Sequence, residues 1–281
     1  MNYKLTFSLL AMAFLMMSYS ETTEQTKPEN TNENVIQEED STLVAPEVVL
    51  TNVNKPVFFD FTSTGCPGCG SWGKPTFVMI KSSENQNIVP IAVHIKYGDP
   101  MITDVSNAIA SNRTGQLFTP QLWVNNTNGM VTSGGRINGT ASVSSIETEI
   151  NAFQDTDVAI QVGVSCFTSE DEIAIRYKTK VLKELDGEYY LGIYVMENGI
   201  FGRQSSSPAN PAEHNNVIRA SNQDGFGTLI PSEELKANAE NEGTFNLKFE
   251  DDWNMKNLYA TIIVWKKSDD KYVVVNANNN L

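Results

Sequence analysis

Two cysteines spaced three residues apart, Cys66 and Cys69, follow an apolar run and constrain the fold of this chain more than any other feature. Residues 57–61 read Val-Phe-Phe-Asp-Phe, a short run typical of a buried strand. Pro67 comes directly after Cys66, and proline is favoured at the first helical position because its missing N–H has no partner there anyway. The spacing predicts a strand that ends near Gly65, with Cys66 at the start of the next helix.

This placement favours thiol chemistry. The thiolate is the reactive form of cysteine, and the N-terminus of a helix stabilises an anion. Cys69 lies one helical turn further on and can attack a mixed disulfide formed by Cys66. We therefore predict Cys66 as nucleophile and Cys69 as resolving thiol, with their disulfide as the redox group and no further cofactor. Pro67 and Gly68 between them would tune the potential and contact the substrate.

A cysteine pair of this spacing also occurs in zinc sites, in structural disulfides and in domains that only bind. A zinc site needs four ligands, and the remaining candidates, Cys166, His94 and His214, are scattered far apart, so no metal is predicted. A purely structural disulfide over two intervening residues would contribute little loop-closure entropy. The third alternative, a redox-shaped motif on a binding domain, stays open. His94 is left without a role.

The surrounding elements predict an α/β domain over residues 48–155. Trp72, Phe77 and Ile80 give the helix after Cys66 an apolar face, and Pro75 would kink it. Further elements are expected at residues 88–95 (strand), 104–111 (helix), 122–125 and 130–132 (strands around an Asn128-Gly129 turn) and 142–153 (helix, capped by Ser144 with Glu147).

Residues 57–69, VFFDFTSTGCPGC, resemble the signature of the thioredoxin-like superfamily. The resemblance implies that Asp60 is a buried acid assisting proton transfer at the resolving thiol. It also implies that Pro120 is a cis-proline beside the dithiol and that the backbone of Thr119 pairs with substrate. The chain departs from thioredoxins at Gly65, where they carry Trp, and at Thr62, where they carry an aromatic residue.

Residues 157–281 have a different pattern. Apolar residues alternate over 158–166, which is typical of a half-buried strand and places Cys166 in the core. More strands are expected near 173–181, 190–196, 245–249, 258–266 and 272–276, with a short helix near 232–237. This pattern predicts an all-β antiparallel sandwich. An irregular connection, about 203–228, contains the polar segment from His214 to Arg219. These side chains either bind a partner or a sugar, or they stabilise the loop through their own hydrogen bonds.

A thioredoxin-like domain followed by a β-sandwich with a His-Asn-x-Val-x-Arg segment resembles the Omp-twenty-eight-related outer-membrane-protein family. This narrower resemblance covers most of the mature chain. It implies an association with the outer membrane of a Gram-negative bacterium.

The N-terminal residues indicate export. Residues 1–20 combine Lys4, an apolar run and small residues at 18 and 20, as in a signal peptide; the alternative is a buried N-terminal helix. Residues 21–47 hold eight acidic residues and one lysine, typical of a disordered linker. Their net charge of −7 is half of the chain's −14, and this acidity argues against nucleic acid as a partner. No transmembrane segment is expected after signal removal.

The sequence thus predicts an exported thiol–disulfide oxidoreductase of the cell envelope, in the periplasm, outer-membrane-associated or at the cell surface. Its partners would be protein thiols or disulfides and a redox partner in the envelope. The alternative is an envelope binding or adhesion protein that uses the thioredoxin-like domain as a scaffold without turnover. The pKa of the Cys66 thiol and its accessibility to solvent distinguish the two functions.

Overall fold

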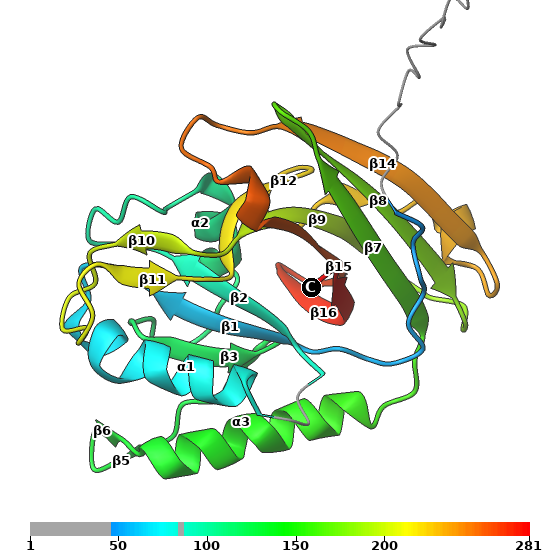
Figure 1. Ribbon diagram of the computed structural model, residues 1–281. Coiled ribbons are helices and arrows are strands. Elements are labelled where there is room, and N and C mark those ends of the chain that lie inside the picture. Colours follow the sequence, from blue (N-terminus) through cyan, green and yellow to red (C-terminus); the bar gives the residue numbers. More distant parts are fainter. Residues whose placement is uncertain (1–45, 84–86) are drawn as a thin grey trace, which may run out of the picture. The chain divides into compact units, whose positions relative to one another are not determined.

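The computed structural model describes residues 46–83 and 87–281. The predicted signal peptide and all but the last two residues of the predicted linker lie outside this part. Within it, strands predominate, and most of them belong to one large mixed sheet (Figure 1).

The mixed sheet is built around strand β1 (Val57–Thr62). β1 pairs in parallel with β2 (Val89–His94) and antiparallel with β3 (Gln121–Val124). The strand order is β16-β15-β9-β12-β2-β1-β3-β4, and β13 also pairs with β9. The other members are β4 (Thr127–Asn128), β9 (Tyr189–Glu197), β12 (Val217–Ser221), β13 (Thr228–Leu229), β15 (Leu258–Ser268) and β16 (Lys271–Asn279).

Strand β1 is buried on both faces, which explains its continuous apolar run. Phe58 packs in a cluster with residues of helices α1 (Lys74–Lys81) and α3 (Gly139–Gln154). Phe59 points to the opposite face and packs in a second cluster with helix α2 (Asp104–Ser111) and with Trp265. The alternation of side chains along a strand therefore places two cores on the two sides of β1.

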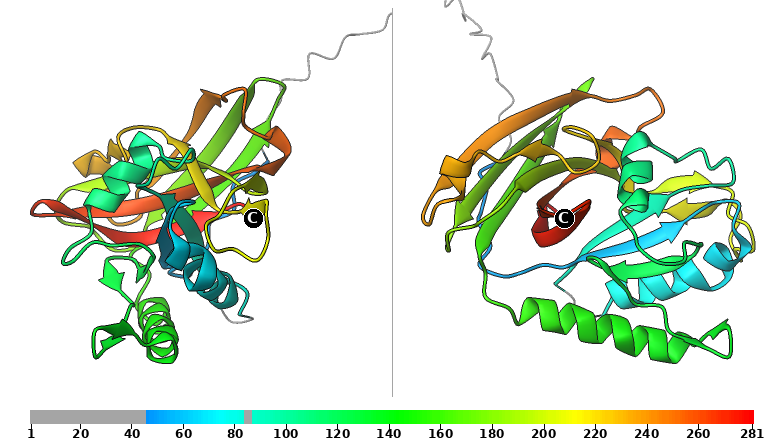
Figure 2. Two further views of the ribbon diagram at one scale, coloured as in Figure 1. Left: turned by 90° about the vertical axis from the view of Figure 1, so that its left-hand side faces the viewer. Right: turned by 180° about the vertical axis from the view of Figure 1, so that it is seen from behind.

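A second, three-stranded sheet has the order β14-β8-β7 (Figure 2). Its strands are β7 (Ile160–Thr168), β8 (Glu172–Val181) and β14 (Glu240–Lys248). Apolar side chains of β7 and β8 form one core cluster with side chains of β9 and β15. The two sheets thus bury a common apolar layer. Short elements complete the fold: β5 (Thr132–Ser133), β6 (Arg136–Ile137), β10 (Ile200–Gly202), β11 (Ala212–His214), and the 3₁₀ turns η2 (Ser232–Leu235) and η3 (Met255–Asn257).

The large sheet continues across the predicted boundary near residue 156. Val217 of β12 lies beside Ala92 of β2, and the Ala92 N–H donates to the carbonyl of Asn216 at 2.7 Å. The core cluster around Phe59 likewise includes residues from both stretches. The division into residues 48–155 and 157–281 stays a prediction, and the structure adds that one sheet and one core cluster span it.

The predicted turn at Asn128-Gly129 is wrong. Val124 pairs with Thr127, so the hairpin turns at Asn125 and Asn126, and Asn125 takes the positive φ of 50°. Gly129 is used differently, because a Cβ there would lie 2.3 Å from Ile146 Cγ1 of helix α3. The glycine allows a helix to approach the chain closely and does not form the turn.

Two further expectations need correction. Helix α3 begins at Gly139, and the Asn138 side chain caps it by accepting from the Ala141 N–H, so the predicted Ser144 cap is wrong. The connection predicted as irregular over 203–228 contains β11, β12 and the start of β13. These strands are too short for an apolar period to emerge, and β12 gains its place from pairing with β2 and β9.

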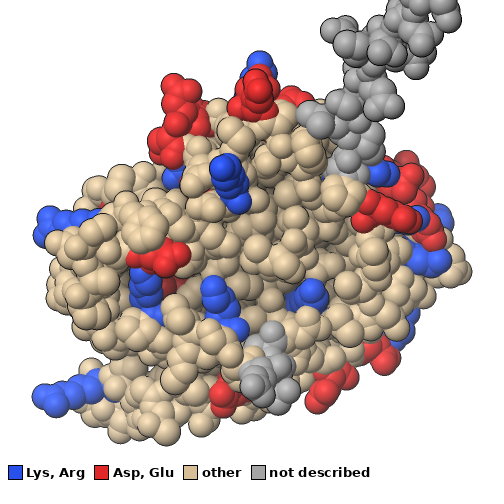
Figure 3. Space-filling model, viewed as in Figure 1, with Lys and Arg blue, Asp and Glu red and all other residues tan. Residues whose placement is uncertain are grey.

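No helix within the described residues is long and apolar enough to cross a membrane. On the face in Figure 3, acidic and basic side chains lie scattered between larger neutral areas. This face therefore lacks the continuous single-sign patch that steers partners over long distances.

Candidate functional site

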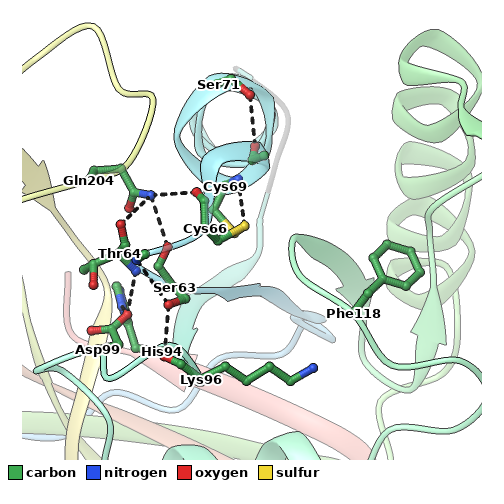
Figure 4. Close-up of a disulfide and its surroundings, with 12 residues drawn as sticks. Ser63, Thr64, Cys66, Cys69, Ser71, His94, Lys96, Asp99, Phe118 and Gln204 are labelled. Carbon is green, nitrogen blue, oxygen red and sulfur yellow. Dashed lines mark hydrogen bonds and ion pairs between the residues drawn. A yellow bond between two sulfur atoms is a disulfide. The ribbon is translucent and has the colours of Figure 1, made fainter.

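The two motif cysteines form a disulfide at the start of a helix (Figure 4). The helix begins at Pro67 as predicted, and the Cys69 backbone N–H lies 3.1 Å from Cys66 Sγ. Cys66 is only 4% exposed and Cys69 is fully buried. In the oxidised protein both sulfur atoms are therefore shielded from solvent, although Cys66 lies at the start of the helix.

The helix carries a π-helical turn, η1 (Cys69–Gly73), directly after the disulfide. Pro75 has no N–H to donate, so a regular α-helical bond from it is impossible. The chain accommodates it with a wider turn, in which the Lys74 N–H donates to the Cys69 carbonyl. The predicted irregularity at Pro75 thus takes the form of a π-helical turn that begins at the resolving cysteine.

A buried hydrogen-bonded pair, His94 and Asp99, anchors the turn that precedes Cys66. The Thr64 N–H donates to Asp99 Oδ2 at 2.7 Å, and the same oxygen lies 2.7 Å from His94 Nδ1. Burial raises the pKa of Asp99, but the hydrogen bonds from His94 and from backbone N–H groups outweigh it and leave the pKa below its ordinary value. His94, for which the sequence predicts no role, therefore supports the loop that carries Cys66.

Asp60 is buried in β1, 3% exposed, as the resemblance implied. Burial raises the pKa of its carboxyl to about 7, and the charge of Lys74 lowers it in part. Among the described residues, Asp60 Oδ1 has no hydrogen-bond partner. The carboxyl of Asp60 therefore changes its protonation state close to neutral pH in the folded protein.

A cavity of about 20 Å³ adjoins Asp60 and collects residues from both halves of the chain. The rings of His94 and His214, the two histidines of the sequence, lie 5.4 Å apart at this cavity. Burial, with the charges of His94 and Lys74, lowers the pKa of His214 to about 4. The cavity is lined by Asp60, Thr62, Lys74, Ala92, His94, Gln204, His214 and Asn215. A neutral imidazole thus lies close to an acid that titrates near pH 7.

The Thr119–Pro120 peptide bond is cis, as predicted. Pro120 packs against the dithiol helix: a Cβ on Gly68 would lie 3.1 Å from Pro120 Cδ, and a Cβ on Gly73 would lie 2.6 Å from Pro120 Cβ. Pro120 is buried, Thr119 is half-buried, and Pro67 is exposed. The structure therefore brings Pro120 against the two-residue link between the cysteines, where the resemblance placed it.

The predicted polar segment at His214 is an internal support. Asn216 is 1% exposed; it donates to Tyr259 Oη at 2.7 Å and accepts from Lys81 Nζ at 3.0 Å. Arg219 pairs with Glu197 and Asp252. These contacts agree with the alternative that polar side chains of the segment stabilise its own conformation through hydrogen bonds and ion pairs.

Sequence reasoning missed two residues of this site, Lys74 and Gln204. Lys74 lies on helix α1, and its Nζ donates to the Glu213 carbonyl. Its position one turn after the dithiol was the one available signal. Gln204 had none, because it lies in an irregular segment 138 residues after Cys66.

Cys166 is half-buried instead of fully buried, because it lies near the end of β7, an edge strand of the smaller sheet. Burial raises the pKa of its thiol, and a hydrogen bond from Asn280 lowers it in part. Although Cys166 is more exposed than Cys66, we expect a thiol reagent to modify Cys66 faster in the reduced native protein, because the helix N-terminus favours the Cys66 thiolate while burial raises the pKa of Cys166. Mass spectrometry maps the modified cysteines. Denatured protein, in which all three cysteines should react alike, is the control. Faster labelling of Cys166 would contradict this assignment.

Within the described residues, no group of three or more His, Cys, Asp and Glu side chains is placed to hold a metal ion.

Comparisons with known proteins reveal a shared fold. No family model matches the sequence, and no curated protein matches it. The structure is similar to HBP35 of Porphyromonas gingivalis, with a TM-score of 0.66 and 16% identity over 82% of this chain and 76% of that one. A domain of the outer membrane lipoprotein Omp28 from the same organism gives a TM-score of 0.29 and 12% identity, over 43% of this chain and 86% of that domain. The first likeness establishes a common fold, and the second does not.

Proposed function

We propose that this chain is an exported thiol–disulfide oxidoreductase of the cell envelope. The observation that carries the proposal is the Cys66–Cys69 disulfide at the start of a helix, packed against cis-Pro120 and preceded by the strand that holds the buried acid Asp60. Disulfides persist in oxidising compartments, which agrees with the export expected from residues 1–20.

The proposal includes a finer description of the fold and family. We assign residues 48–155 to a thioredoxin-like domain and residues 157–281 to a β-sandwich, within the Omp-twenty-eight-related family. The order of strands and helices through α3 supports the first assignment. The core shared by β7, β8, β9 and β15 supports the second. The fold shared with HBP35 supports the combination.

The exchange balances over two steps. The Cys66 thiolate attacks one sulfur of a partner disulfide, forms a mixed disulfide and releases the first partner thiolate. The Cys69 thiolate then attacks Cys66 Sγ, forms the Cys66–Cys69 disulfide and releases the second partner thiolate. The partner gains two electrons and this protein loses two; the reverse sequence oxidises a partner dithiol. Asp60 would accept the Cys69 proton in the reducing direction and return it in the other.

Replacing Cys69 by Ser tests the proposal. The Cys69→Ser variant should accumulate mixed disulfides through Cys66, because the residue that resolves them is gone. The Cys66→Ser variant should accumulate none and should lose disulfide exchange with a model protein. The measurement is non-reducing electrophoresis of envelope extracts, with identification of the attached partners. Equal accumulation in both variants, or in neither, would contradict the assignment.

One observation favours the second candidate, an envelope binding protein without turnover. Cys66 is 4% exposed, so a partner sulfur reaches it only after a neighbouring segment moves. An oxidoreductase should exchange with glutathione in its native state. A binding scaffold should keep its disulfide until unfolding exposes it, and this difference separates the two candidates.

A further inference from the structure

Gln204 reaches from the second half of the chain to the turn that carries Cys66. It follows strand β10 and is 6% exposed. Its side-chain Nε2 lies 3.1 Å from the Ser63 carbonyl, 3.4 Å from the Thr64 carbonyl and 3.2 Å from the Cys66 carbonyl (Figure 4). One amide group thus serves three backbone acceptors around the dithiol.

The backbone beside Gln204 is fixed to the same turn. The Ser205 N–H donates to the Thr64 carbonyl at 2.8 Å. A Cβ on Gly70, in the turn after Cys69, would lie 2.0 Å from the Ser205 carbonyl oxygen. The two backbones approach so closely that residue 70 has room only for glycine, so the Gln204 amide is held in place.

These hydrogen bonds act on the backbone that orients the Cys66 sulfur. The Ser63 carbonyl also accepts from the Cys66 N–H at 3.1 Å, which closes the turn. The Cys66 carbonyl also accepts from the Gly70 N–H at 3.4 Å, a long bond in the first turn of the helix. Gln204 therefore holds the peptide groups on both sides of Cys66. Its amide N–H groups also offset the partial negative charge of the carbonyl oxygens close to the sulfur.

The orientation of Cys66 decides how well its thiolate is stabilised. In the disulfide, the Cys69 N–H already points at Cys66 Sγ from 3.1 Å. After reduction, the same N–H and the helix N-terminus stabilise the thiolate only while the Cys66 backbone keeps this orientation. A more stable thiolate favours the reduced form and makes the couple more oxidising.

We propose that Gln204 is a positioning residue for Cys66, which keeps the Cys66 backbone fixed so that the reduced form of the dithiol is stabilised. This inference rests on the proposed oxidoreductase function. It also gives the second half of the chain a defined part in the chemistry of the first.

Gln204→Met tests the inference, because methionine keeps the length of the side chain and removes the donors. We expect the equilibrium constant of the Cys66–Cys69 couple against glutathione to shift about tenfold toward the disulfide, which is about 30 mV for a two-electron couple. The pH profile of Cys66 alkylation should move to higher pH in parallel. Gln204→Glu, which keeps the shape of glutamine, should shift the equilibrium further at pH 7, because a carboxylate would face the three carbonyls. It serves as the second variant if methionine prevents folding.

The matched control is Asn276→Leu. Asn276 is fully buried and donates to two backbone carbonyls, those of Val53 and Ile160, near the opposite end of β1. This variant should lose stability but keep the wild-type potential. A wild-type potential in folded Gln204→Met and Gln204→Glu, or an equal shift in Asn276→Leu, would overturn the positioning role. If the Cys66–Cys69 pair of the wild-type protein shows no measurable redox equilibrium with glutathione, the proposed function itself would be overturned instead.

Discussion

The Asp60→Asn variant is expected to be more stable than the wild type by about 2–4 kcal/mol above pH 7. Burial raises the pKa of Asp60 from 3.8 to about 7. Between these values the folded protein keeps a proton that the unfolded chain releases, so wild-type stability falls as the pH rises from about 4 to about 7. The asparagine of the variant does not ionise and lacks this loss. The measurement is the free energy of unfolding by denaturant at several pH values, in the oxidised state.

Function should change in the opposite direction. If Asp60 exchanges the Cys69 proton, its removal should slow the resolution of mixed disulfides on the order of 10²-fold. Asp157→Asn is the control, because Asp157 lies on the surface with Lys183 and does not line the cavity at Asp60. Wild-type and Asp60→Asn stability curves that stay parallel between pH 4 and pH 7 would show that Asp60 does not titrate in this window.

The Trp265→Ala variant is expected to lose about 3–5 kcal/mol of stability, the usual cost of truncating a buried tryptophan. Trp265 is 1% exposed, its ring stacks on Phe59 at 6.5 Å, and its Nε1 donates to Tyr194 Oη at 2.8 Å. Because this core joins β15 to β1, the variant should unfold at lower denaturant in a single transition that includes both halves of the chain.

Two probes check this prediction in one titration. Far-ultraviolet circular dichroism follows the unfolding of the strands, and reduction of the Cys66–Cys69 disulfide by an added reductant follows the unfolding of the first half. Trp253→Ala is the control, since Trp253 is only half-buried and should cost less. Two separate transitions, with the dithiol half unaffected by Trp265→Ala, would show that the halves fold independently.

The local elements were predictable where one strong pattern governs them. The apolar run of β1, the proline after Cys66 and the 104–111 helix each follow from short-range preferences, and the structure has all three. The pairing of the two cysteines followed from their spacing and from the proline between them. The burial of Asp60 and the cis bond before Pro120 followed from the thioredoxin-like resemblance.

The remainder depends on long-range contacts that no local pattern encodes. Strand β12 is short and forms because β2 and β9 lie on either side of it. The sequence around Gly129 is typical of a turn, but glycine is needed there because Ile146 of helix α3 leaves no room for a Cβ. Gln204 contributes to the dithiol only after the chain returns from β10, and its own neighbours in sequence give no indication of this.

The pairing of β12 with β2 has a consequence for the order of events during synthesis. Residues 48–155 leave the ribosome before residues 217–221. At that stage the edge of β2 that later pairs with β12 is still unpaired. Exposed strand edges recruit other strands, so a nascent or truncated chain would present an adhesive edge until residues 217–221 arrive to cover it. A premature stop after residue 155 should therefore yield aggregates and not a smaller functional protein.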